Sequence, residues 1–424
     1  MVYVISKDGQ PLMPTTRHGK VRRLLDAGKA KVVKRCPFTI KLLYDSGHYT
    51  KDLTLGVDTG SGAVGAAVSD DDGNIFYMSE ISLRNDISDK MTERRKYRRN
   101  RRNRKTRYRK PRFSNRGNST RKDRFSPTMT SKLHSHEKEI RFARSILPVK
   151  RLVLETGRFD PHLMKHAGEA FNRHWGYQKG PNYGFSNTKA MVLSRDGHTC
   201  QCCKGKRKDT KLEVHHIIYR SNGGRDDADN LVTLCHTCHK AVHNNDVTIN
   251  QKGKVKSGLK FATQMNSISV QLLKRFPEAI ETFGYITKPN REMLDLPKEH
   301  YIDACVIASG GKPVTMLADI VYVKRCIPEG DFQKTKGVRS EQPITTGKIA
   351  GFKKFDKVRY LGKEYFIKGR MSTGYAILMG IDCKKADFSN MPKGFKTPKL
   401  ANCERLEARS SWMVTTEAVI RNTA

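Results

Sequence analysis

The chain has 424 residues and carries 81 Lys and Arg against 42 Asp and Glu, which gives a formal net charge of +39. Such a charge makes a polyanion the expected partner, and the length predicts roughly two to four domains. No run approaches the roughly 18 apolar residues that cross a bilayer, and the N-terminus lacks a secretory pattern, so we expect a soluble, cytoplasmic protein.

Residues 1–52 predict a small basic module. Its expected elements are a strand at Val2–Ile5, the stretch Pro11-Leu12-Met13-Pro14, a short basic helix that ends at Gly28, and strands at Val32–Val33 and Phe38–Tyr44. Glycine favours the left-handed conformation with which many helices end. The order of elements is that of a ββαβ-like unit.

A second block begins with an apolar strand, Leu53–Asp58, which ends on a carboxylate. The small-residue strand Ala63–Val68 follows, and Asp70–Asn74 predicts a turn before a third strand at Ile75–Met78. We therefore expect a hairpin sheet that presents Asp58 at the tip of its first strand.

The most charged stretch runs from Thr92 to Arg112, and 17 Lys and Arg lie between Met91 and Arg124. Arg and Lys favour helix, with Thr92 as the expected cap and Pro111 as the expected stop. A helix with cations on all sides cannot bury an apolar face, which indicates contact with phosphates. The candidate nucleic-acid-binding residues are Arg94, Arg95, Arg98, Arg99, Arg101, Arg102, Arg104 and Arg107.

Hydrophobic patterns divide the rest of the chain. Arg151–Glu155 is a second apolar strand that ends on a carboxylate, and helical periodicity occurs in Met265–Phe276 and Glu299–Ser309. Gly351–Ile381 is rich in strand formers and has two glycine hairpin turns, so it predicts a small barrel-like module.

Five of the ten cysteines lie in one short stretch, at Cys200, Cys202, Cys203, Cys235 and Cys238. This clustering indicates a metal site in a reducing compartment rather than a disulfide framework. Two CxxC pairs about 30 residues apart suit tetrahedral zinc, with Cys200, Cys203, Cys235 and Cys238 as ligands and Cys202 as the spare thiol. A zinc ribbon without further chemistry is the alternative.

Histidines between and after the CxxC pairs argue against a bare zinc ribbon. His215 and His216 lie on a predicted strand, while His239 and a histidine four residues later share one face of a predicted helix. Over residues 186–245 the sequence resembles the HNH (ββα-metal) nuclease family. The roles implied by this resemblance are a general base for His216, ligation of one catalytic Mg²⁺ by His215 and His239, with His243, and orientation of the loop between the strands by Asn230.

These residue types suit phosphodiester hydrolysis. Imidazole titrates near pH 6.5 and can accept a proton at neutral pH, while a divalent ion stabilises charge that develops on a phosphate. Structural roles without a metal are the alternative for His236 and His243.

Acidic residues from three distant segments form a second candidate site. Asp58 and Glu155 each end an apolar strand, while His300 and Asp303 share one helix face. Together they could hold two divalent ions roughly 3.5 to 4 Å apart, an arrangement that hydrolyses phosphodiesters. In this order they resemble a RuvC nuclease of the RNase H-like fold, split into three segments. The resemblance implies Asp58, Glu155 and Asp303 as Mg²⁺ or Mn²⁺ ligands and His300 as a proton acceptor or metal-adjacent residue.

The order of these parts resembles the IscB family of transposon-encoded RNA-guided nucleases, which are related to the CRISPR type II effectors. The expected fold class is α/β, as an α+β multidomain chain with structural zinc in an inserted HNH domain. The implied segments are a PLMP N-terminal domain at 1–52, RuvC segment I at 53–90, a bridge helix at 91–113, a basic linker at 114–130, RuvC segment II at 131–175, the HNH domain at 186–245, RuvC segment III at 258–330 and a β-rich C-terminal domain at 331–424.

The resemblance also implies partners and a reaction. The partners are a structured guide RNA of the omega type and a double-stranded DNA target with an adjacent motif, bound by a monomeric protein in the prokaryotic cytoplasm at the nucleoid. HNH would cut the guide-paired strand and RuvC the displaced strand. Two alternatives stay open: a protein-guided HNH endonuclease of the homing or restriction type, which has no use for three RuvC segments, and a zinc-containing nucleic-acid-binding protein without catalysis, which does not depend on Asp58 or His216.

Overall fold

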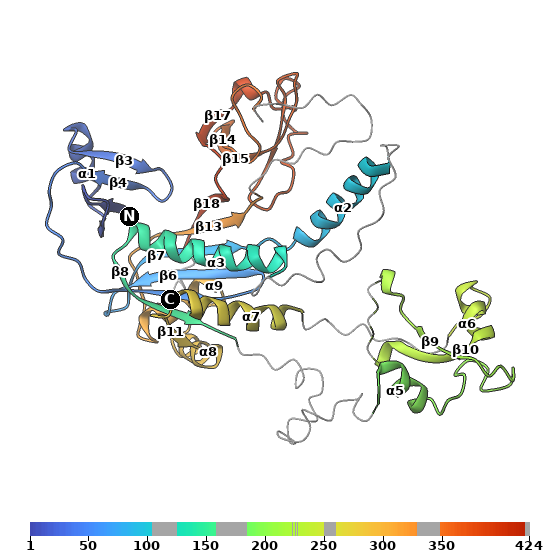
Figure 1. Cartoon of the computed structure of the whole chain (residues 1–424). Helices are drawn as coiled ribbons and strands as arrows, with labels where there is room; N and C mark the ends of the chain where they lie inside the picture. The colour runs from blue at the N-terminus through green and yellow to red at the C-terminus, as the bar shows by residue number, and fades with distance from the viewer. Residues whose placement is uncertain are drawn as a thin grey trace. The chain divides into compact units, whose positions relative to one another are not determined.

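The computed structural model describes residues 1–103, 125–157, 185–222, 224, 226, 228–249, 260–328 and 348–419 (Figure 1). The chain forms two compact units, of which the first comprises Met1–Arg158 with Gln264–Ala424 and the second comprises Phe159–Thr263. In these described parts, no helix combines the length and the apolar character needed to cross a membrane.

The first unit begins with a small four-stranded sheet. Its elements are β1 (Val2–Ile5), β2 (Pro11–Thr15), α1 (His18–Asp26), β3 (Ala30–Lys34) and β4 (Thr39–Leu42), with the strand order β2-β1-β4-β3. Val21 of the helix packs against Val2 and Ile40 in a small apolar core. Gly28 follows the helix with a φ of 65°, as its sequence position predicts, and the PLMP stretch is itself a strand.

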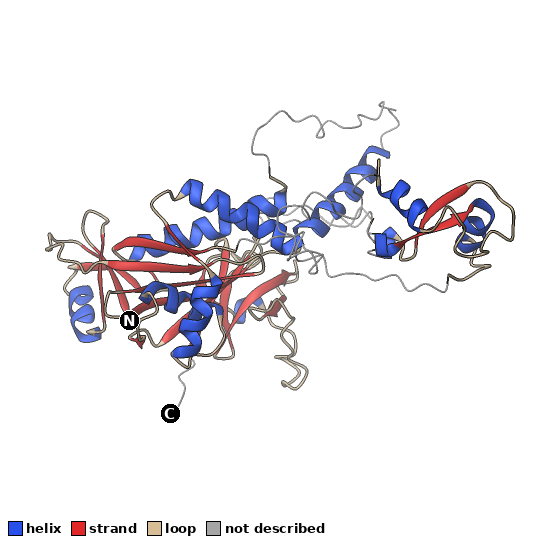
Figure 2. Cartoon of the chain, turned by 90° about the horizontal axis from the view of Figure 1, so that it is seen from below, coloured by secondary structure: helices blue, strands red, loops and turns tan. Residues whose placement is uncertain are grey.

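A larger sheet of eight strands follows, and Figure 2 shows the strands of the unit in red. Its members are β5 (Leu53–Asp58), β6 (Ala63–Ser69), β7 (Asn74–Ser82), β8 (Val149–Glu155), β11 (Ile280–Thr282), β12 (Thr315–Met316), β13 (Ile320–Cys326) and β18 (Trp412–Ala418). The order is β11-β8-β5-β6-β7-β13-β18, and β12 pairs with β7. Only β6 and β18 run against the others, so β5, β7, β8, β11 and β13 end at one edge of the sheet.

Helices cover both faces of this sheet. On one face, α3 (Pro127–Ile146) and α7 (Lys260–Arg275) contribute to the main apolar core. Alternate residues of the strands, such as Val64, Ala66 and Val68 of β6, belong to the same core. On the other face, α9 (His300–Ser309) packs against residues such as Ala67. Successive side chains of a strand point to opposite faces, which is why β6 serves both cores.

Two glycines allow α9 to approach the sheet closely. A Cβ added at Gly56 would lie 2.5 Å from the carbonyl oxygen of Ala304, and one added at Gly65 would lie 1.9 Å from that of His300. No real Cβ tolerates such distances, so only glycine fits at these two positions. Every α9 residue from Tyr301 to Ser309 is buried as a result.

A buried ion pair ties α3 to β13. Lys324 Nζ lies 2.7 Å from Glu139 Oε2, and the two side chains are only 1% and 0% exposed. Tyr77 and Ser79 of β7 each donate a hydrogen bond of 2.6 Å to Glu139. Because the charges are paired and hydrogen-bonded, the core accepts them without an uncompensated charge. The pair therefore joins three segments that are distant in the sequence.

The arginine-rich helix is present as α2 (Ile87–Asn103), with limits that differ from those expected. The helix begins before Thr92, whose hydroxyl donates to the carbonyl of Ser88 inside the helix instead of capping its start. Arg94, Arg95, Arg98 and Arg99 are exposed, and Arg101 and Arg102 belong to the last turn. Arg104, Arg107, Pro111 and parts of the expected segments 114–130, 131–175 and 331–424 lie outside the described residues.

Near the C-terminus, four strands form an antiparallel sheet in place of the expected barrel-like module. They are β14 (Lys357–Tyr360), β15 (Lys363–Arg370), β16 (Ala376–Met379) and β17 (Glu404–Glu407), in the order β16-β15-β14-β17, with a short 3₁₀ turn at Leu400–Asn402. The final strand, β18, pairs with β13, and Trp412 lies opposite Cys326. Residues 412–418 therefore complete the large sheet and do not belong to the C-terminal module.

The second unit contains a ββα arrangement, as expected for residues 186–245. Its elements are α5 (Thr188–Arg195), β9 (Leu212–His216), short 3₁₀ turns at Arg220–Asn222 and Ala228–Asn230, β10 (Leu231–Cys235) and α6 (His236–His243). The two strands are antiparallel, with Val232 opposite His215. Asn187 caps α5 by accepting a hydrogen bond of 2.9 Å from the backbone of Ala190.

The substitution Gly65→Ala tests the close approach of α9. Because the new methyl group would overlap the backbone of His300, we expect the free energy of unfolding to fall by about 1 to 3 kcal/mol. Gly62→Ala is the matched control, since an added Cβ there meets no atom within 4 Å. Urea unfolding followed by circular dichroism measures both, and equal midpoints for the two variants would contradict the packing described here.

Candidate functional site

The carboxylate site consists of Asp58, Glu155, His300 and Asp303, which come from three separate elements. Asp58 and Glu155 are register partners at the ends of β5 and β8, so their side chains leave the same face of the sheet. Helix α9 lies on that face, and its first residue places His300 Nδ1 2.6 Å from Asp58 Oδ2. The structure thus brings the four residues selected from the sequence to one edge of the sheet.

Buried oxygens at this site fit a divalent cation. Asp303 is 3% exposed and pairs with Lys298, while its Oδ1 lies 3.0 Å from Arg291 Nε without hydrogen-bond geometry. Glu155 Oε2 is also buried without a hydrogen-bond partner. Carboxylate oxygens are the preferred ligands of Mg²⁺ and similar hard cations, and buried polar atoms rarely lack partners. The donor set therefore suits such an ion.

The electrostatics of the carboxylate site agree with this fit. Burial raises the pKa of Glu155, a hydrogen bond from Thr287 opposes the change, and the negative charges of Asp58 and Asp303 add to it. The hydrogen bond to Asp58 raises the pKa of His300. Mutual repulsion among the carboxylates is the feature that a bound cation would relieve.

The histidine site, formed by His215, His216, His239 and His243, lies in the second unit between β9 and α6. One ring nitrogen from each of His215, His239 and His243 lies within 4.8 Å of the others. His239 and His243 are one turn apart and share the face of α6 that meets His215. Burial, together with the nearby imidazoles, lowers the pKa of His215 to about 4, so its ring is neutral and can bind a metal.

His216 contacts a different partner. Its Nε2 lies 2.7 Å from Asp226 Oδ1, and Arg220 donates to both oxygens of Asp226 at 2.7 and 2.8 Å. Neighbouring residues of a strand point to opposite sides, which separates His216 from the three-histidine cluster. The hydrogen bond to Asp226 fixes the ring and leaves Nδ1 as the nitrogen that can accept a proton.

Asn230 braces the loop that follows His216. Its side-chain oxygen accepts a hydrogen bond of 2.9 Å from the backbone N–H of Ile218, and its amide donates one of 3.0 Å to the carbonyl of the same residue. Asn230 is 2% exposed, so these hydrogen bonds are shielded from water. Its geometry corresponds to the loop-orienting role inferred from the sequence.

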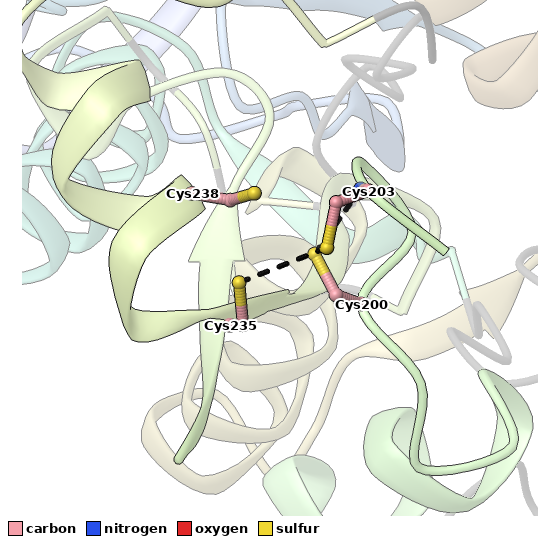
Figure 3. A group of neighbouring side chains, drawn as sticks. All are labelled: Cys200, Cys203, Cys235 and Cys238. Carbon is pink, nitrogen blue, oxygen red and sulfur yellow. Dashed lines mark hydrogen bonds between the residues drawn. The ribbon is translucent and has the colours of Figure 1, made fainter. Parts of the chain in front are cut away.

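The thiol cluster joins two parts of the second unit. Figure 3 shows Cys200 and Cys203 in the loop after α5, facing Cys235 and Cys238 at the junction of β10 and α6. The four sulfurs lie within 4.8 Å of one another, and those of Cys203 and Cys235 are 3.9 Å apart. Backbone N–H groups of Arg207 and Gly205 help to lower the pKa of Cys203 to about 6, which favours the thiolate that zinc binds.

Two known families match the chain. Residues 2–180 match the family described as RRXRR protein, and residues 200–245 match the HNH endonuclease family. The HNH match covers the thiol cluster and all four residues of the histidine site. Together the two matches span more than half of the chain and combine an RRXRR region with a nuclease module. The chain belongs to the IscB/Cas9-like nucleases.

Two individual proteins are similar to parts of the chain. This IscB/Cas9-like nuclease is 40% identical over 62 residues to the type IV methyl-directed restriction enzyme EcoKMcrA of Escherichia coli K12, covering 13% of this chain and 22% of the enzyme. It is 32% identical over 72 residues to anaredoxin of Nostoc sp. PCC 7120, covering 17% of this chain and 91% of anaredoxin. The chain therefore contains a module of anaredoxin's family, while it spans only about a fifth of the restriction enzyme.

Solved structures of Cas9 are also similar to the chain. Cas9 of Streptococcus thermophilus, in complex with the GGAA PAM, matches with a TM-score of 0.34 and 12% identity over 58% of this chain and 32% of that one. Type II-C Cas9 of Actinomyces naeslundii matches with a TM-score of 0.16 and 14% identity over 43% and 31% of the two chains. The IscB/Cas9-like nuclease thus spans about a third of these Cas9 chains.

Glu213 is a residue of this nuclease that the sequence analysis did not select. Its Oε2 lies 2.9 Å from His239 Nδ1, and its Oε1 lies 3.1 Å from His236 Nδ1. A carboxylate on Nδ1 orients a histidine so that Nε2 faces a metal. Glu213 stands two positions before His215 on β9 and so shares its face, a strand periodicity that could have identified it.

Zinc content tests the thiol cluster of the IscB/Cas9-like nuclease. Because tetrahedral zinc needs all four thiolates, Cys203→Ser should reduce the bound zinc from about one ion per chain to a small fraction after dialysis against a chelator. Cys202→Ser is the matched control, because Cys202 precedes Cys203 in the sequence but is not one of the four thiols of the cluster. Inductively coupled plasma mass spectrometry gives both values. Equal losses in the two variants would contradict the proposed ligands.

Proposed function

We propose that this IscB/Cas9-like nuclease is an RNA-guided DNA endonuclease that cuts both strands of its target. The observation that carries the proposal is the presence of two candidate hydrolytic sites of different chemistry, one in each compact unit. The histidine site would cut the strand paired to the guide, and the carboxylate site would cut the displaced strand. We further propose that the large sheet is a RuvC core of RNase H-like type, that α2 is a bridge helix, and that the thiol cluster holds structural zinc.

The position of α2 supports binding of nucleic acid beside the carboxylate site. Strand β7 ends at Ser82 on the same edge of the sheet as Asp58 and Glu155, and α2 begins soon afterwards at Ile87. Exposed arginines follow along this helix, from Arg94 onwards. Guanidinium groups bind phosphates strongly, so a guide RNA or its heteroduplex would lie close to the sheet edge.

At the carboxylate site, Asp58, Glu155 and Asp303 would hold Mg²⁺ or Mn²⁺. When bound, the metal supplies charge neutralisation on the phosphate and an activated water. In the structure Asp303 is neutralised by Lys298 and Arg291, so its carboxylate would exchange these two cations for the metal. His300, held through Nδ1 by Asp58, presents its other ring nitrogen for proton transfer.

At the histidine site, His215, His239 and His243 would hold one divalent cation. Glu213 orients His239 through its contact with Nδ1, and Asn230 holds the loop after β9 through its hydrogen bonds with Ile218. His216 would accept the proton of the attacking water at Nδ1, because its Nε2–H is engaged by Asp226. Three histidines of β9 and α6 would thus bind the metal, while a fourth histidine, His216 of β9, would accept the proton.

A protein-guided endonuclease of the restriction type is the second candidate. The 40% identity to EcoKMcrA favours it, because that relative is a methyl-directed restriction enzyme. Such an enzyme would need no bound RNA and no arginine-rich helix beside a second site. The presence or absence of RNA on the purified protein therefore separates the two candidates.

Strand-resolved cleavage tests the two sites. Asp58→Ala and His216→Ala should each convert double-strand cutting into nicking, on opposite strands, with cleavage of the affected strand slowed by at least about 100-fold because a metal ligand or a general base is removed. A duplex target with a different label on each strand, incubated with the guide-loaded complex, separates the products on a denaturing gel.

Exposed residues of the same types provide the controls. Asp72→Ala removes a carboxylate at a surface turn, and His134→Ala removes an exposed imidazole of α3. Both variants should cut both strands at the normal rate. If Asp58→Ala and His216→Ala nick the same strand, the assignment of one strand to each site is incorrect.

Retention of RNA tests the guide. The purified protein should carry a structured RNA of discrete size, and Arg98→Ala combined with Arg99→Ala should weaken its binding and reduce the slope of log affinity against log salt by roughly one to two, because two phosphate contacts are lost. Filter binding across a salt series measures this.

The matched control for the RNA experiment is Lys206→Ala combined with Arg207→Ala, which removes two adjacent exposed cations from the second unit. We expect its slope to remain near that of the unmodified protein. Purification without any discrete RNA would favour the restriction-type candidate instead.

A further inference from the structure

We propose that Phe283 and Tyr285 form a stacking platform for an unpaired base of single-stranded DNA at the entrance to the carboxylate site. This inference rests on the proposed function, since it names how that site would receive its strand. The two rings lie parallel, with an interplanar angle of 8° and centroids 5.4 Å apart. They belong to the junction of β11 with α8 (Gly284–Met293).

The platform is adjacent to the carboxylates. Thr282, the last residue of β11, is the register partner of Glu155, and Phe283 and Gly284 follow directly. A Cβ added at Gly284 would lie 3.1 Å from Glu155 Oε1, so the backbone between the two aromatic residues touches the candidate ligand. A base stacked on Tyr285 would therefore place its own phosphate within reach of the site.

Tyr285 has an accessible ring. Phe283 stacks on one face of it, yet Tyr285 is 73% exposed. Ile286 and Met293 on the same helix are exposed as well, at 43% and 81%. A Phe–Tyr pair that is already stacked offers a rigid surface, so a third ring can be added at little entropic cost.

Nearby cations define the chemistry of the occupant. Lys288 on α8 pairs with Glu292, and Lys298 just before α9 pairs with Asp303, yet their side chains are 69% and 65% exposed and so can also meet a phosphate. Aromatic rings with interspersed lysines bind single strands, because bases stack on the rings while phosphates meet the cations. A paired duplex hides its base faces and cannot use such a platform. The geometry thus favours the displaced single strand over double-stranded DNA.

Photocrosslinking with the guide-loaded complex tests the platform directly. The target carries 5-iodouracil at successive positions of the displaced strand, and the protein carries Asp58→Ala so that this strand stays intact. We expect one or two adjacent positions to crosslink to the peptide that contains Phe283 and Tyr285, as mapped by mass spectrometry. Crosslinks spread over other aromatic residues, with none in this peptide, would overturn the proposal.

Substitutions separate stacking from charge. Tyr285→Ala should weaken the binding of a short single-stranded DNA by about 10-fold without changing the salt slope, whereas Lys288→Gln should reduce the slope by about 0.7. Tyr285→Trp should retain binding, which shows that a ring is needed. The matched control is Tyr49→Ala, since Tyr49 is 97% exposed and lies outside the site. Equal affinities for Tyr285→Ala and the unmodified protein would refute the platform.

The outcome is independent of the strand-cleavage experiment. If Asp58→Ala stops cutting of the displaced strand while Tyr285→Ala changes neither crosslinking nor binding, the carboxylate site stands and the platform is wrong. If the Tyr285→Ala defect persists with DNA that lacks a base at the crosslinked position, stacking is not its cause and the proposal fails. Loss of the defect with that abasic DNA supports it.

Discussion

Close packing of α9 against β5 and β6 determines the geometry of the carboxylate site. Gly56 and Gly65 remove the side chains that would hold the helix away, so the backbone of α9 rests on the backbone of the sheet. At this separation His300 reaches Asp58, and Asp303 is close enough to Glu155 for its negative charge to raise the pKa of Glu155. The chemistry at the sheet edge thus depends on two residues that have no functional groups.

Sequence patterns identified the candidate sites where local signals report directly on structure. Strands that end on Asp58 and Glu155 were visible because a buried strand is a continuous apolar run and its last residue breaks that pattern. The CxxC pairs were visible because zinc ligation needs thiols at fixed spacing. His300 and Asp303 were visible because helical periodicity places them on one face.

Other features depend on contacts between distant residues, which no local pattern reports. Helix α3 was not identified, and its first residues were assigned to a linker, because Lys132, His136 and Glu139 interrupt the apolar residues of its buried face. Glu139 can be buried only because Lys324 of β13 pairs with it. The partnership of His216 with Asp226 likewise depends on how the loop after β9 folds. Polar partners that only the folded chain brings together are therefore the main reason why the sequence misleads here.

The pairing of β13 with β18 has a consequence for the modular construction of the chain. Cys326 and Trp412 lie opposite each other, so the chain leaves the large sheet and returns to it at neighbouring points. The four-stranded C-terminal sheet is thus an insertion between β13 and β18, and its Phe366 and Met379 share an apolar cluster with Met413 of β18. A replacement for this insertion would therefore have to leave the large sheet and return to it at the same two points, and would have to supply an apolar surface that covers Met413.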